Sequence, residues 1–112
     1  MVKKAIPQKA RKEITNYLNI LLSEKLPISK VVVFGSVAKG NSNPWSDIDL
    51  CIVSPSFQDS WQATNYLWSK RKLTDVHFAI EPVGFSPQDF ESEFDSLVQE
   101  IKKTGIEIPI GK

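Results

Sequence analysis

One polar stretch between two apolar runs contains residue types that favour phosphate and metal chemistry. Gly35 and Ser36 end the first run, and Asp47 and Asp49 begin the second. Two carboxylates at positions i and i+2 of a strand project from the same face, roughly 6–7 Å apart. Their like charges repel each other unless a cation lies between them. Divalent ions with oxygen ligands, Mg²⁺ first and Mn²⁺ next, would neutralise such a pair during phosphoryl chemistry.

Gly35 and Ser36 have the properties that an anion site needs. Glycine lets the backbone approach a phosphate closely and permits unusual dihedral angles. Ser36 offers a hydroxyl and a backbone N–H group. If residues 36–40 form a short helical turn, its free N–H groups point at an anion and Gly40 ends the turn.

Each of these features also has a plainer interpretation. The glycine–serine pair can be an ordinary turn, and Asp47 a turn residue at a solvated strand start. That interpretation explains less, because Asp49 would lie inside an otherwise apolar strand, where an unpaired carboxylate is costly. Cys51 points to the same side as the aspartates, and we interpret it as a small core residue rather than a nucleophile.

The segment GSVAKGNSNPWSDIDL resembles the signature of the polymerase-beta-type nucleotidyltransferase superfamily. The shared pattern is Gly-Ser, a small-residue turn ending in Gly, and then Ser-Asp-x-Asp-Leu. The length of the chain is similar to that of the minimal nucleotidyltransferases, and the order of elements around the motif also matches.

The resemblance implies a role for each motif residue. The nucleotide would be bound by Gly35, Ser36, Lys39 and Ser46, although many relatives carry Arg in the turn that contains Lys39. Asp47 and Asp49 would bind two Mg²⁺ ions, with Mn²⁺ as a possible substitute. An acceptor hydroxyl would attack the α-phosphate, and pyrophosphate would leave.

In the family a third carboxylate on the next strand completes the metal site and helps to activate the nucleophile. We expect Asp75 to fill this position as a third catalytic and metal-binding residue. Glu81 and His77 are the alternatives, since strand alternation places both on the same face as Asp75. The imidazole of His77 suits Mg²⁺ poorly.

The elements that must position these residues follow from hydrophobic periodicity and from turn residues. Helices are predicted over 8–25, 60–72 and from Ser86 to Gly105, and strands over 30–34, 47–53 and 73–83, with a possible edge strand over 106–110. The predicted fold is a small α/β (α+β) domain, with a mixed sheet flanked by helices in the order α-β-β-α-β-α. We expect residues 1–112 to form one nucleotidyltransferase domain.

The apolar positions on one face of each predicted helix are expected to be buried. These positions are Ile14, Tyr17, Leu18, Leu21 and Leu22; Trp61, Leu67 and Trp68; and Phe90, Phe94, Leu97, Val98 and Ile101.

Composition limits the other classes of function. The chain has 112 residues, a formal net charge of +1 and one cysteine. The charge gives no general argument for nucleic-acid or membrane binding. A lone cysteine excludes a disulfide framework. Because the N-terminal residues lack the apolar core of a secretory signal, we expect a cytoplasmic protein.

Three hypotheses for function follow from the resemblance. The first is an active enzyme that transfers a nucleoside monophosphate, with AMP as the expected group, to a hydroxyl acceptor. The second is an antitoxin-like protein that pairs with a small helical partner of the HEPN type, or adds AMP to it. The third is a relative that binds nucleotide with little or no turnover.

Overall fold

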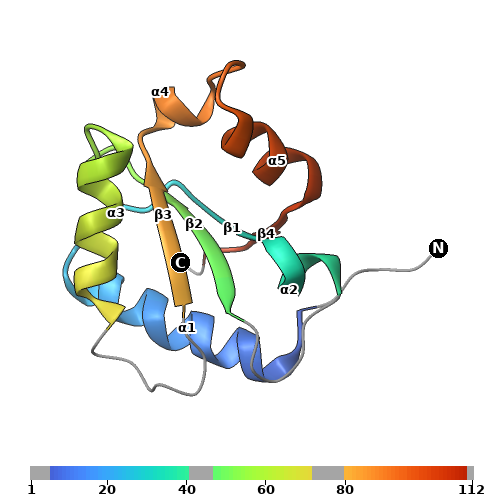
Figure 1. Cartoon of the computed structure of the whole chain (residues 1–112). Coiled ribbons are helices and arrows are strands. Elements are labelled where there is room, and N and C mark those ends of the chain that lie inside the picture. Colours follow the sequence, from blue (N-terminus) through green and yellow to red (C-terminus); the bar gives the residue numbers. More distant parts are fainter. Residues whose placement is uncertain (1–5, 41–46, 72–79, 111–112) are drawn as a thin grey trace.

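In a computed structural model of the chain, the structure describes residues 6–40, 47–71 and 80–110. The elements in chain order are α1 (Gln8–Ser23), β1 (Lys30–Phe34), α2 (Gly35–Lys39), β2 (Ile48–Val53), α3 (Ser60–Ser69), β3 (Ile80–Phe85), α4 (Pro87–Phe90), α5 (Ser96–Thr104) and β4 (Ile106–Ile108). The strands form one sheet with helices packed around it (Figure 1). The predicted α/β fold is confirmed, and the short turn expected after the first strand is the helix α2.

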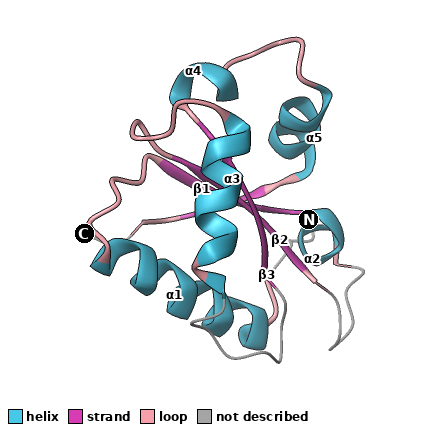
Figure 2. Cartoon of the chain, turned by 60° about the vertical axis from the view of Figure 1, so that its left-hand side comes forward, coloured by secondary structure: helices cyan, strands magenta, loops and turns pink. Residues whose placement is uncertain are grey.

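The sheet has the strand order β3-β2-β1-β4 and mixed pairing. β1 is antiparallel to β2 and to β4, whereas β2 and β3 are parallel. A parallel pair needs a crossover connection, and α3 lies in this connection, beside the sheet (Figure 2). The predicted edge strand after the last helix is confirmed as β4.

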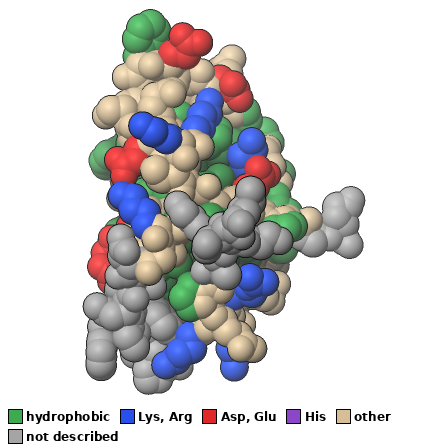
Figure 3. Space-filling model, turned by 90° about the vertical axis from the view of Figure 1, so that its right-hand side faces the viewer, with side chains coloured by type: hydrophobic (Ala, Val, Ile, Leu, Met, Phe, Trp, Pro, Cys, Tyr) green, Lys and Arg blue, Asp and Glu red, His purple; other side chains and the backbone are tan. Residues whose placement is uncertain are grey.

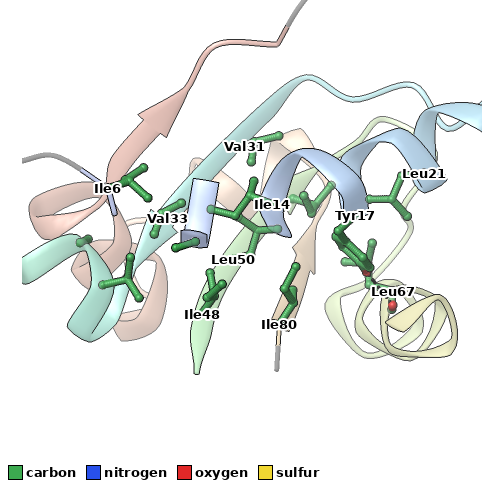
Figure 4. Packing of buried hydrophobic residues seen from close by; sticks show 14 of the residues in the cluster. Ile6, Ile14, Tyr17, Leu21, Val31, Val33, Ile48, Leu50, Leu67 and Ile80 are labelled. Atoms are coloured by element: carbon green, nitrogen blue, oxygen red, sulfur yellow. Dashed lines mark hydrogen bonds between the residues drawn. The ribbon is translucent and has the colours of Figure 1, made fainter. Parts of the chain in front are cut away.

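One face of the sheet packs against α1 and α3. Ile14, Tyr17 and Leu21 of α1 meet apolar side chains of β1, β2 and β3 (Figure 4). Tyr17 is fully buried, and its hydroxyl donates a hydrogen bond to the carbonyl of Leu67 in α3 at 2.6 Å. This bond gives the buried phenol a hydrogen-bond partner and links α1 to α3 on the same face of the sheet.

The opposite face packs against α4 and α5. Its cluster contains side chains from β1, β2 and β3 together with Phe90 of α4 and Val98 and Ile101 of α5. Cys51 is fully buried in this cluster, and burial raises the pKa of its thiol to about 12. The cysteine is therefore a core residue, as its place in the strand predicts.

α3 also contacts the outer edge of β3. The indole Nε1 of Trp68 donates to the carbonyl of Pro82 at 2.9 Å. The N–H of Gly84 donates to Oγ1 of Thr64 at 3.1 Å. Pro82 fits an edge strand because it has no N–H group to offer a further strand.

The last predicted helix is wrong as a single element. α4 begins with the predicted cap, because Ser86 accepts a hydrogen bond from the N–H of Asp89. The helix then ends at Phe90, and Asp95 begins a second helix by accepting from the N–H groups of Leu97 and Val98. A cap inside the predicted helix stabilises a new helix start there and overrides the apolar periodicity.

Several side chains predicted to be buried are exposed. Phe94 lies between the two helices and is 95% exposed, and Leu97 is partly exposed. Trp61 is 78% exposed because α3 buries Ala63 and Leu67 instead. The same correction applies to Trp68 and Leu22, which lie at the margins of the buried faces of α3 and α1.

The ends of three other elements differ from prediction. α1 ends at Ser23 and α3 at Ser69, a few residues earlier than expected. β3 runs to Phe85, past the predicted end at Val83, because Pro82 is tolerated in this edge strand. The predicted start of that strand, over residues 73–79, lies outside the described residues. Within the ranges that are described, no helix is long and apolar enough to span a membrane.

Candidate active site

The sheet register brings two acidic residues to the same end of the sheet. Asp49 in β2 is paired with Phe34 in β1 and with Glu81 in β3. Paired residues on neighbouring strands project from the same face, so the two carboxyl groups are neighbours. Asp47 lies two residues before Asp49, at the exposed start of β2. Strand alternation therefore gathers three carboxyl groups on one face.

The turn from β1 into α2 closes one side of this cluster. Gly35 follows Phe34 directly, with φ +75°, a region that glycine enters without a steric penalty. A Cβ atom at Gly35 would lie 2.0 Å from Oδ2 of Asp49. Both the dihedral angle and the space therefore require glycine at this position.

α2 begins with Gly35 beside Asp49 and ends with a residue exposed to solvent. Val37 and Ala38 are buried and anchor the helix to the core. Gly40 ends it in the left-handed conformation, as predicted. Ser36 is half-buried, and Lys39 is exposed.

The crowding of the carboxyl groups changes their acidity. Burial is the main cause of the raised pKa of Asp49, and the charges of Asp47 and Glu100 raise it further. The pKa of Glu81 is raised by its hydrogen bond with Asp47, by burial and by the charges of both aspartates. The hydrogen bond from Glu81 opposes the rise in the pKa of Asp49. Hydrogen bonding within the cluster thus favours the charged form of Asp49 and the protonated form of Glu81.

The three carboxyl groups are chemically suited to a hard cation, because they offer only oxygen ligands. Their present arrangement is different. In the described part of the chain, no three His, Cys, Asp or Glu side chains are already arranged to hold a metal ion. Glu81 instead hydrogen-bonds to Asp47 and Asp49. Binding of an ion would require these side chains to turn from one another toward the ion.

The structure describes most of the predicted site residues. Gly35 lies beside Asp49, Ser36 follows Gly35 in the chain, and Asp47 lies two residues before Asp49. Of the three candidates for the third position, Glu81 is the one that falls among the described residues, and it lies beside the aspartates. Ser46, Asp75 and His77 are outside the described residues.

Two charged residues near the cluster were not predicted. Glu100 on α5 is close enough for its charge to act on Asp49, and it pairs with Lys39 at 3.9 Å. The guanidinium of Arg71 lies 4.0 Å from the ring centroid of Trp68. The charge of Arg71 opposes the rise in the pKa of Glu81, which comes first from the hydrogen bond with Asp47. Sequence periodicity gave no signal for either residue, because both approach the site from other elements.

A pocket of about 300 Å³ lies at the other end of the sheet. It is lined by the residues that precede β1 and follow β2, among them Pro27 and Phe57, and by Ala63 and Tyr66 of α3. None of its lining residues belongs to the carboxylate cluster.

Comparison with known proteins identifies a family. The family model described as a nucleotidyltransferase domain matches residues 14–107, from the first helix to the last strand. None of the curated proteins matches the chain. Among solved structures, the chain is similar to one described as "Crystal structure of the toxin-antitoxin with AMP-PNP". The two share 21% identity with a TM-score of 0.49, over 82% of this chain and 69% of that chain.

Proposed function

Because the chain belongs to the nucleotidyltransferase domain family, we propose that it transfers a nucleoside monophosphate from a nucleoside triphosphate to a hydroxyl acceptor, in a metal-dependent reaction. The proposed donor is ATP, so that AMP is the transferred group. The observation that supports this most directly is the pairing of Asp49 with Glu81, next to the glycine turn that begins α2.

In this proposal, Asp47, Asp49 and Glu81 would hold two Mg²⁺ ions. Bound Mg²⁺ supplies positive charge that stabilises the phosphate oxygens during transfer. Glu81 is proposed as the third carboxylate because, among the described residues, it lies beside both aspartates. Asp75 lies outside those residues and stays a predicted alternative. As a carboxylate beside both aspartates, Glu81 is placed to accept the proton of the acceptor hydroxyl.

The other side of the proposed site binds the triphosphate. The absence of a side chain at Gly35 lets the backbone approach both Asp49 and a phosphate. Ser36 offers its hydroxyl and its N–H group at the start of α2. Lys39 adds a point charge, without the bidentate geometry of arginine. Ser46 stays a predicted nucleotide ligand.

Labelled nucleotides test the proposal directly. The protein would be incubated with Mg²⁺ and each α-labelled nucleoside triphosphate, alone and with candidate acceptors. Pyrophosphate release and label transfer would be measured for the wild type and for a variant with Asp47→Asn and Asp49→Asn. Unchanged nucleotide binding and transfer in that variant would contradict the proposal.

A second candidate is an antitoxin-like protein that binds a small helical partner of the HEPN type. Two exposed aromatic side chains favour a protein partner. Phe94 is 95% exposed between the acidic residues Glu93 and Asp95, and Trp61 is 78% exposed on α3. Aromatic side chains are enriched at protein interfaces relative to the rest of the surface. The partner would also be a natural source of the acceptor hydroxyl.

Co-purification with the product of a neighbouring gene tests this second candidate. A variant with Trp61→Ser and Phe94→Ser should lose the complex and keep its nucleotide affinity, because neither residue lies in the carboxylate cluster. A complex of unchanged affinity would contradict the role of these two residues. A stable monomer that finds no partner would count against the second candidate as a whole.

A further inference from the structure

An ion pair joins the proposed phosphate-binding turn to the last helix. The ammonium Nζ of Lys39 in α2 lies 3.9 Å from Oε2 of Glu100 in α5. The two side chains are 44% and 53% exposed, so both can change rotamer without disturbing the core. Figure 3 views this side of the molecule and shows basic and acidic side chains next to one another.

Glu100 lies near both halves of the site. It pairs with Lys39 on the phosphate side. On the metal side its charge acts on Asp49, whose pKa is raised mainly by burial and further by Asp47 and Glu100. A carboxylate in this position has the charge of a phosphate oxygen, and it contacts the cation that the turn would offer to a phosphate.

We propose that Glu100 is paired with the Lys39 ammonium in the nucleotide-free protein. A triphosphate must then displace Glu100 from Lys39 in order to bind. This inference rests on the proposed function, because it takes the nucleotide to bind at α2. Glu100 is a positioning residue here and contacts no reacting atom.

The proposal predicts an effect of definite sign. Glu100→Gln removes the competing charge and keeps the size of the side chain, so the nucleotide should bind more tightly. Exposed ion pairs are weak, and we expect a gain of about two- to fivefold in affinity. The gain should decrease with rising salt, because exposed charges are screened.

A double-mutant cycle separates this mechanism from a general repulsion between the charge of Glu100 and the nucleotide. Calorimetry would measure the affinity for a non-hydrolysable ATP analogue at fixed Mg²⁺ in the wild type, Glu100→Gln, Lys39→Met and the double variant. If Glu100 acts through Lys39, Glu100→Gln tightens binding in the wild type and has a much smaller effect when Lys39 is Met. Any effect of Glu100 on the metal site is common to both backgrounds and cancels.

Glu91→Gln is the matched control. It removes another ion pair of α5, between Glu91 and Lys102, also at 3.9 Å, and it should leave the nucleotide affinity unchanged. The inference would be wrong if Glu100→Gln weakened binding or left it unchanged, or if the gain were equal in both Lys39 backgrounds. Absence of nucleotide binding in all four proteins would instead overturn the proposed function.

Discussion

Gly35 and Asp49 lie so close together that a Cβ atom on Gly35 would come within 2.0 Å of Oδ2 of Asp49. Gly35 begins α2 and Asp49 lies in β2, yet the two residues are adjacent in the structure. The glycine therefore has two functions in the structure: it allows the positive φ that begins α2, and it leaves room for a carboxylate.

Gly35→Ala tests this contact. We expect a loss of about 2–5 kcal/mol in the free energy of unfolding, from the positive φ and from overpacking, and loss of nucleotide binding. Gly40→Ala is the matched control, because Gly40 has φ +78° but, among the described residues, no atom lies within 4 Å of the point that a Cβ would occupy. It should cost only about 1 kcal/mol. Urea denaturation and calorimetric titration would measure both effects, and equal losses would contradict the role of the contact.

Glu81→Gln tests which residue completes the site. If Glu81 accepts the proton of the acceptor hydroxyl, its loss should reduce pyrophosphate release by about 10²–10⁴-fold. The free energy of unfolding should change little, because Gln keeps the size of the side chain and can still donate a hydrogen bond to the aspartates. Asp75→Asn is the comparison. If Asp75→Asn abolished the activity and Glu81→Gln kept it, the third carboxylate would be Asp75.

The buried thiol of Cys51 should make the stability of the protein depend on pH in the alkaline range. Burial raises the pKa of its thiol to about 12 in the folded protein, whereas an unfolded cysteine titrates at about 8.5. Because the folded pKa is the higher one, the stabilisation is complete below pH 8.5 and is lost as the pH rises toward 12.

The free energy of unfolding should therefore fall by about 2 kcal/mol between pH 7 and pH 10 on account of this thiol. Cys51→Ala should lose less over the same interval, because it has no group to titrate there. Urea denaturation of both proteins at the two pH values measures the difference. Equal losses would show that the thiol does not contribute to the loss of stability at alkaline pH.

Lys25 offers a site for stabilisation far from the carboxylates. It follows α1 with φ +65°, and its N–H donates to the carbonyl of Leu22 at 2.9 Å. Glycine is the usual residue at this point of a helix end. We expect Lys25→Gly to raise the free energy of unfolding by about 0.5–1 kcal/mol. Lys25→Ala keeps the Cβ and should give no such gain in thermal or urea denaturation.

The parts of the fold that follow from local sequence were predicted well. β1 matches its predicted range, and β2 begins one residue later than expected. The alternation of β2 placed Asp49 on the same face as Cys51, and the structure confirms this face. Such features depend on residues that are neighbours in the chain, so the pattern of apolar side chains determines them.

The remaining features depend on contacts between distant segments. Glu81 comes beside Asp49 through the parallel register of β2 and β3, which no local pattern determines. Asp95 shows a different limit, since its cap competes with apolar periodicity and both signals are present in the sequence. Trp61 is exposed because the choice of buried face on α3 depends on the sheet beneath it. Long-range pairing, competing helix starts and the choice of helix face thus account for the differences.

The contacts between α3 and the outer edge of β3 have a consequence for self-association. An open strand edge can recruit a strand from another molecule and begin aggregation. At this edge Pro82 has no N–H group, its carbonyl already accepts from Trp68, and the N–H of Gly84 is bonded to Thr64. The strand that carries Glu81 is thereby protected from intermolecular pairing. The opposite edge is β4, whose three residues offer only a short template for such pairing.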